Sequence, residues 1–89
     1  MKRLRTLNPN QAERLRSLAA YIDHAHAACT GYELIWAELR SRGAQMQFTG
    51  GTYWIALEGV RASATAGMER AIGAWARAAH RRLANGGRA

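Results

Sequence analysis

Residues 45–65, QMQFTGGTYWIALEGVRASAT, constrain the fold most, because they predict three short strands joined by two tight turns. Gly50-Gly51 and Glu58-Gly59 each separate two alternating segments, and two-residue loops of this composition favour hairpin turns in which φ is positive. Turns of this length set the register, and both hairpins then place their apolar side chains on the same face of the sheet. The expected pairs are Thr49–Thr52, Phe48–Tyr53, Met46–Ile55 and Ala44–Leu57 in the first hairpin, and Leu57–Val60, Ile55–Ala62 and Tyr53–Ala64 in the second.

The segments on either side of these strands predict helices, since their apolar residues recur at the three- and four-residue spacing of one helical face. We therefore expect one small α+β domain, residues 1–89, in which a three-stranded antiparallel meander packs against helices in the order α-α-β-β-β-α. The expected helices span about residues 9–29, 31–42 and 66–84, and the expected strands span about residues 44–49, 52–57 and 60–64.

Each expected helix begins at a residue whose side chain can cap it. Asn8 precedes Pro9, which suits the first helical position, and Thr30 and Thr65 are the expected caps of the second and third helices. Gly31 favours a break between the first two helices, and an unbroken helix through Gly31 is the alternative. The side chains expected in the core are Leu15, Leu18, Ile22, Ala25 or His26, and Cys29 from the first helix; Tyr32, Ile35, Trp36 and Leu39 from the second; Met68, Ile72, Trp75, Ala79 and Leu83 from the third; and Met46, Phe48, Tyr53, Ile55, Leu57 and Val60 from the sheet, under the third helix.

The composition limits the kinds of protein that this chain can be. Its 89 residues suffice for one core, and its single cysteine, Cys29, cannot form an internal disulfide. A reducing cytoplasm is therefore the expected location, and no apolar run is long enough to span a membrane. The net charge is +7, and residues 70–89 contain five arginines and no acidic residue. Such basic ends favour an anionic partner, and charge kept for solubility is the alternative.

The residue types that most often bind metals or carry catalysis are not arranged for either task. His24 and His26 point about 200° apart on a helix, and Cys29 falls with His26 on the expected buried stripe. His80 would be the one further imidazole ligand, so we expect no metal site. The acidic residues are scattered, and no glycine-rich phosphate loop follows a strand, so we expect no catalytic residue, no cofactor and no enzymatic activity.

Three arginines of the last expected helix form the first candidate binding surface, the arginine ridge. Arg70, Arg77 and Arg81 fall within about 40° of one another, opposite the buried stripe, and span about 16 Å along the helix. Guanidinium groups suit bidentate contacts to phosphates or carboxylates, so the ridge predicts contact with nucleic acid or an acidic protein surface. A solvated face whose cations complement the helix C-terminus is the alternative. Secondary basic candidates are Arg14, Arg40 and Arg42.

The second candidate surface is the face of the meander that points away from the expected core, here called the outer face. Trp54 lies at its centre between Gln47 and Ser63, and Arg61 projects from the same face. An exposed tryptophan can stack on a base or fill a pocket of a partner protein. Cover by the first helix, or by a second copy of the chain, is the alternative. The remaining members of this face are Gln45, Thr49, Thr52 and Thr65.

The order of one helix, three strands and one helix is similar to that of the double-stranded RNA-binding domain. That family grips phosphates with a lysine cluster at the start of its last helix. This chain has Ala66, Gly67, Met68, Glu69 and Arg70 at that place. Only Arg70 could take the part of a lysine there, so the resemblance is one of topology.

The segment Thr52–Leu83, TYWIALEGVRASATAGMERAIGAWARAAHRRL, resembles small stand-alone proteins encoded by phages and mobile elements, anti-CRISPR proteins among them. Anti-CRISPR proteins share no common motif or fold, so the resemblance transfers no functional residue. It implies a compact, non-enzymatic body that blocks a nucleic-acid channel or occludes a subunit of a defence complex. Because this chain is basic, an acidic protein face or nucleic acid is the expected contact.

We therefore expect a non-enzymatic inhibitor of phage or mobile-element type that binds a host protein or ribonucleoprotein complex, with no membrane partner. The resemblance implies that it acts in the cytoplasm of a bacterial host. The residues expected to make the contact are Trp54, Arg61, Arg70, Arg77 and Arg81. Direct nucleic-acid binding as a small regulator is one alternative. A homo-oligomeric module, a homodimer in the simplest case, that buries the Trp54 face is the other.

Overall fold

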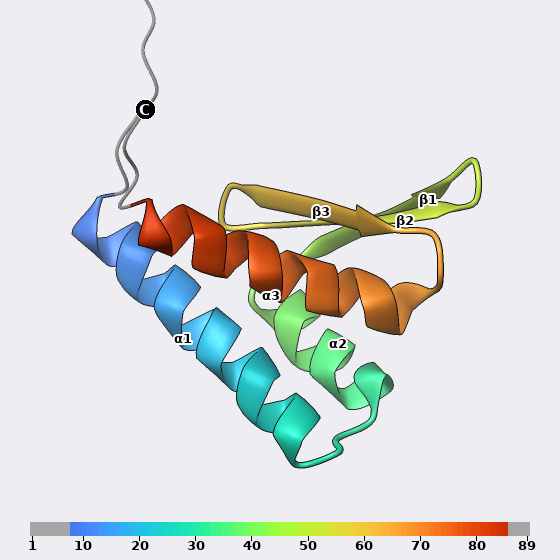
Figure 1. Cartoon of the computed structure of the whole chain (residues 1–89), viewed down its shortest axis with the longest axis horizontal. Helices are drawn as coiled ribbons and strands as arrows, with labels where there is room; N and C mark the ends of the chain where they lie inside the picture. The colour runs from blue at the N-terminus through green and yellow to red at the C-terminus, as the bar shows by residue number, and fades with distance from the viewer. Residues whose placement is uncertain (1–7, 86–89) are drawn as a thin grey trace, which may run out of the picture.

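The computed structural model describes residues 8–85, which form three helices and a three-stranded sheet (Figure 1). The helices are α1 (Pro9–Ala27), α2 (Tyr32–Ser41) and α3 (Met68–Ala84), and the strands are β1 (Gln45–Thr49), β2 (Thr52–Leu57) and β3 (Val60–Ala64). The α+β class and the order α-α-β-β-β-α are those that the sequence predicts. Residues 1–7 and 86–89 of the expected domain lie outside the described part.

The sheet is an antiparallel meander with the strand order β1-β2-β3, and its predicted register is confirmed. Because β1 begins at Gln45, the ladder does not extend to the predicted Ala44–Leu57 pair. The pairs of the two ladders that carry the apolar face are Phe48–Tyr53, Met46–Ile55, Leu57–Val60, Ile55–Ala62 and Tyr53–Ala64.

Both hairpin turns have two residues in the left-handed region. The φ angles are 59° and 80° at Gly50 and Gly51, and 52° and 76° at Glu58 and Gly59. Positive φ at both central residues is the type I′ pattern, whose twist matches that of the flanking strands. Glu58 adopts this region at a cost that glycine avoids, and two residues from the first two turns of α1 bond to it.

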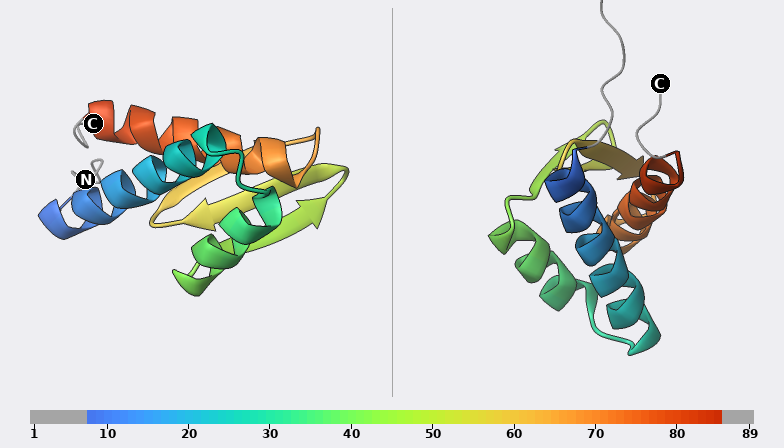
Figure 2. Two further views of the ribbon diagram at one scale, coloured as in Figure 1. Left: turned by 90° about the horizontal axis from the view of Figure 1, so that it is seen from below. Right: turned by 90° about the vertical axis from the view of Figure 1, so that its left-hand side faces the viewer.

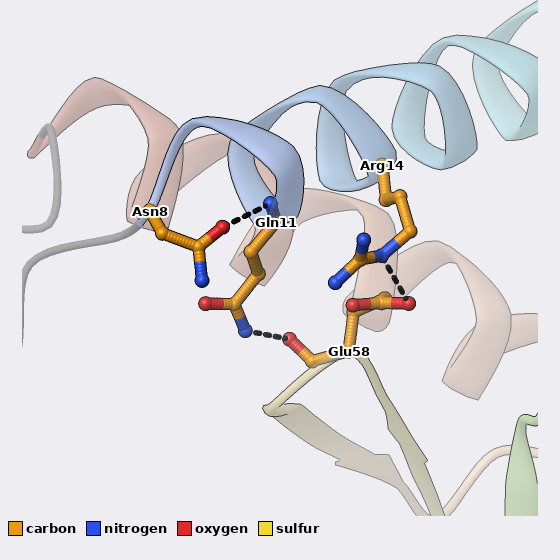
Figure 3. Close-up of polar contacts among 4 residues, drawn as sticks. All are labelled: Asn8, Gln11, Arg14 and Glu58. Carbon is orange, nitrogen blue, oxygen red and sulfur yellow. Dashed lines mark hydrogen bonds and ion pairs between the residues drawn. The ribbon is translucent and has the colours of Figure 1, made fainter.

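The start of α1 is tied to the turn between β2 and β3 (Figure 3). The Asn8 side chain caps the helix by accepting a hydrogen bond of 2.7 Å from the Gln11 backbone N–H, as predicted. The Gln11 amide donates to the Glu58 carbonyl at 3.0 Å, and Arg14 Nε lies 2.9 Å from Glu58 Oε2. These contacts place the N-terminus of α1 against the sheet without covering its outer face.

The core lies between the sheet and the helices, with α3 at its centre. This helix packs against β3 and β2 on one side and against α1 on the other, so it lies across the sheet as predicted. Trp75 is fully buried, and its indole Nε1 donates to the Val60 carbonyl at 3.0 Å. The buried side chains are those of Leu15, Leu18, Ala19, Ile22, Ala25, Ile35, Leu39, Ala44, Ile55, Leu57, Val60, Ala71, Ile72, Trp75, Ala76 and Ala79.

The break between α1 and α2 is confirmed, but the predicted end of α1 and the predicted Thr30 cap are wrong. α1 ends at Ala27, and Cys29 has a φ of 59°. The backbone N–H of Thr30 donates to the Ala25 carbonyl and that of Cys29 to the His26 carbonyl, which is the Schellman closure. Thr30 therefore serves the end of α1, and Gly31 becomes the N-cap of α2 without a side-chain hydrogen bond.

The start of α3 also differs from the prediction. The N-cap is Gly67, whose φ is 122°, and Thr65 is an exposed residue between the end of β3 and the helix. The chain needs the bend at 65–67 to reverse from β3 onto the inner face of the sheet, so the helix begins at Met68 instead of residue 66.

Several residues predicted for the core are exposed. The relative exposure of Met46 is 39% and that of Phe48 is 59%, because β1 is an end strand and its hairpin projects past the helices (Figure 1). Tyr32, at 39%, lies at the first turn of α2. Of the alternatives Ala25 and His26, Ala25 is the buried one and His26 is exposed on α1, and Cys29 is exposed beyond the end of the helix. Trp36, Tyr53, Met68 and Leu83 are only partly buried at the margin of the core.

Candidate binding surfaces

The outer face of the sheet is not covered by any described helix, because all three helices lie on the opposite side (Figure 2). Strand alternation separates the two faces: Ile55 is fully buried, whereas its neighbour Trp54 is 37% exposed. The alternative in which the first helix covers Trp54 is therefore wrong. α1 packs against α3 instead, and its first two turns bond to the turn between β2 and β3.

Trp54 and Arg61 form the centre of this outer face. Trp54 pairs with Gln47 on β1 and with Ser63 on β3, and Arg61 lies diagonally from it on β3, opposite Ala56. The Arg61 guanidinium carbon is 5.3 Å from the centroid of the Trp54 ring, a cation–π distance. The arginine thus holds one part of the indole and leaves the rest open to a partner.

A shallow hollow of about 400 Å³ opens beside Trp54. The amide side chains of Gln45 and Gln47 form its wall on β1, so both donors and acceptors line it. Arg61 contributes the one charge on the outer face of the three described strands. The remaining lining residues are Met46 and Ala56.

The arginine ridge is present on α3, with Arg70, Arg77 and Arg81 all exposed. Within the described residues, none of these three forms an ion pair. Trp75 turns toward β3, and Arg77 follows two residues later, about 200° around the helix. The ridge therefore faces away from the sheet, and the predicted site residues divide into two separate surfaces.

Arg70 and Arg77 also line an open hollow of about 850 Å³ where the end of α1 and the start of α2 meet α3. Asp23 lies in this hollow and pairs with His80 at 2.7 Å. The hollow is lined further by His26, Cys29, Thr30, Gly31, Tyr32, Glu69, Gly73 and Ala76. Over residues 8–85, no group of three histidine, cysteine or acidic side chains is placed to hold a metal ion.

Two of the three secondary basic residues have partners within the chain. Arg14 pairs with Glu58 across 2.9 Å, and Arg42 pairs with Glu38 at the same distance, one helical turn away. Arg40 is exposed in the last turn of α2, where the helix dipole favours a cation. Arg14 thus connects α1 to the turn between β2 and β3, Arg42 bonds within the end of α2, and neither belongs to the surface around Trp54.

No protein-family model matches the chain, and neither a curated protein nor a solved structure matches it. Among the described residues, no helix is long and apolar enough to cross a membrane.

Proposed function

We propose that this chain is a non-enzymatic binding protein that attaches to a nucleoprotein complex through two surfaces of different chemistry. The outer face, centred on Trp54 and Arg61, contacts a protein subunit. The arginine ridge of α3 contacts an acidic or nucleic-acid component. The observation that carries this proposal is the uncovered Trp54, 37% exposed on a face without a described helix.

A protein partner suits the outer face better than a nucleic acid does. Nucleic-acid affinity comes chiefly from cations set against phosphates, and the described strands place one cation, Arg61, on that face. Tryptophan and arginine are among the residues most enriched at the energetic centres of protein interfaces. The shallow hollow beside Trp54, with Gln45 and Gln47 on its wall, offers the mixed apolar and hydrogen-bonding surface of such a centre.

The arginine ridge supports an oxyanion contact. Its three side chains are exposed, and acidic side chains of the described chain do not neutralise them. Guanidinium groups bind carboxylates and phosphates in the same bidentate way, so both acidic protein and nucleic acid fit this surface. The resemblance of Thr52–Leu83 to small phage and mobile-element proteins supports a defence complex of a bacterial host as the target, and inhibition as the outcome.

Affinity capture from the host with the tagged chain tests this proposal, using wild type, Trp54→Ala and the double variant Arg77→Glu with Arg81→Glu. We expect a protein partner that stays bound after nuclease treatment. Loss of Trp54 should weaken its binding by about 30-fold or more, the size of a hot-spot truncation. Thr49→Ala, an exposed change at the far end of the same face, is the matched control. Equal recovery by all four proteins would exclude both surfaces.

Direct nucleic-acid binding by the ridge is a second candidate, favoured by the three arginines without ion-pair partners among the described residues. A gel shift with labelled single-stranded and duplex DNA and RNA, titrated with salt, tests it. Binding that falls steeply with salt and weakens in the ridge variant would support this function, since each neutralised phosphate releases counterions. No shift at low salt would rule it out.

A further inference from the structure

The free edge of β1 lacks the usual features that keep edge strands apart. β1 is an end strand, and all five of its residues are exposed. Natural edge strands are commonly guarded by charged side chains, proline or a bulge, and the sequence QMQFT contains neither a charge nor a proline. The β1–β2 register is also continuous, without a bulge. This edge is therefore open to pairing with another strand.

The backbone groups that face outward from β1 belong to its two apolar residues. In a two-residue hairpin the pair that closes the turn, Thr49 and Thr52, exchanges hydrogen bonds. Hydrogen-bonded and non-bonded pairs then alternate, so the N–H and C=O groups of Met46 and Phe48 point away from β2. Hydrogen bonds from a second strand would therefore be made by the backbone of Met46 and Phe48, the two apolar residues of β1.

Charge also singles out this hairpin as a place where two copies can approach. Residues 43–57 are the longest stretch of the sequence without a charged side chain, although the net charge is +7. The arginine ridge is on α3, which packs against β3 and β2 and makes its main contacts away from the β1 edge. Two chains that meet edge to edge at β1 therefore keep these arginines apart.

We propose that two copies of the chain pair through their β1 strands, antiparallel and centred on Gln47, to form a continuous six-stranded sheet. This register overlaps all five residues of both strands, and it sets Met46 opposite Phe48 of the second copy on the inner face. One side of the Phe48 ring already contacts Tyr53, with ring centroids 4.6 Å apart. Phe48 is 59% exposed, and the other side of its ring would contact Met46 of the second copy.

The dimer leaves the outer face free and doubles it, which distinguishes it from a dimer that buries Trp54. Trp54 pairs with Gln47 within each copy, so the two tryptophans and two glutamines would form one row across four strands. The Cα atoms of the two tryptophans would be about 14 Å apart, three interstrand spacings. A single strand pair is smaller than a standard interface, so we expect a weak, reversible dimer.

Sedimentation velocity of the purified chain over a range of concentrations tests the dimer without any partner, so its result is independent of the proposed function. We expect the mass to rise from that of one chain toward that of two. Gln47→Lys places two cations opposite each other at the two-fold axis and should weaken the dimer by about fivefold. Gln45→Lys is the matched control, because residue 45 meets residue 49 instead of itself. A single-chain mass at every concentration, or a dimer that Gln47→Lys leaves intact, would overturn the proposal.

Disulfide trapping tests the register. In a Cys29→Ser background, Gln47→Cys would place two cysteines in a non-hydrogen-bonded pair with Cα atoms about 4.5 Å apart, within disulfide range. Thr49→Cys is the control, since its two copies would lie about 13 Å apart along the strands. We expect a reducible covalent dimer from the first variant and none from the second. Equal trapping of both, or none of either, would contradict pairing centred on Gln47.

Discussion

Tryptophan occurs three times in this chain, in three different environments. Trp75 is fully buried and hydrogen-bonded to the Val60 carbonyl, Trp36 is partly buried, and Trp54 is 37% exposed. The helical spacing predicts the burial of Trp75, and strand alternation places Trp54 on the outer face. The degree of exposure follows from packing: α3 meets the sheet through Trp75, and no described helix covers the outer face, to which Trp54 belongs.

Phenylalanine substitutions of Trp75, which is buried, and Trp54, which is exposed, should have different effects on the free energy of unfolding. Trp75→Phe removes the donor to the Val60 carbonyl and leaves a space in the core, so we expect a loss of about 2–4 kcal/mol in the free energy of unfolding. Trp54→Phe should change it by no more than about 0.5 kcal/mol. Urea denaturation measures both. A large loss for Trp54→Phe would mean that its indole stabilises the monomer.

Gly59 is a second residue whose role depends on a distant contact. Its φ is 76°, and a Cβ at this position would lie 3.0 Å from the Gln11 amide nitrogen, which donates to the Glu58 carbonyl. A left-handed backbone conformation costs alanine about 1–2 kcal/mol. We expect Gly59→Ala to destabilise the fold by more than this, because the added Cβ also crowds the Gln11 amide. Gly51→Ala is the matched control, with a φ of 80° and no atom near the added Cβ. Equal losses in thermal or urea denaturation would show that the Gln11 contact adds nothing.

At the scale of elements, the hairpins were more predictable than the helix ends. A two-residue turn and the alternation of apolar residues determine the register locally, so the Gly50-Gly51 and Glu58-Gly59 turns suffice to predict the ladders. Helix caps depend on how neighbouring elements compete for the same residues. Thr30 illustrates this. Its backbone N–H donates to the Ala25 carbonyl at the end of α1, and Gly31 takes the N-cap position of α2.

A better N-cap residue for α2 should stabilise the protein. Gly31 is an N-cap with φ −62° and ψ 146°, a conformation open to any residue, and it has free space around a Cβ. Gly31→Ser adds a capping oxygen and reduces the freedom of the unfolded chain, so we expect a gain of about 0.5–1 kcal/mol in the free energy of unfolding. Gly43→Ser, at a φ of 99°, should instead destabilise the fold. A loss in the first variant would contradict the cap assignment.

At the scale of the whole molecule, the sequence indicates which face of the sheet is apolar but not how far the helices extend over it. Met46 and Phe48 follow the same alternation as Ile55, yet both are exposed, because β1 is an end strand and its hairpin projects past the helices. Coverage depends on helix length and crossing direction, which a single strand pattern does not contain. For the same reason, the sequence could not decide whether α1 covers Trp54. It also could not show that the predicted site residues lie on two separate surfaces.

Site-specific photo-cross-linking in the host is the most direct test of the outer face as the contact surface. A photoreactive amino acid replaces Ser63, exposed beside Trp54 on β3, or Ala20, exposed on α1. If the outer face binds the partner, the Ser63 probe should yield a discrete cross-linked protein and the Ala20 probe should not. Cross-links from Ala20 alone, or none from Ser63 while the partner is captured, would contradict a binding surface centred on Trp54.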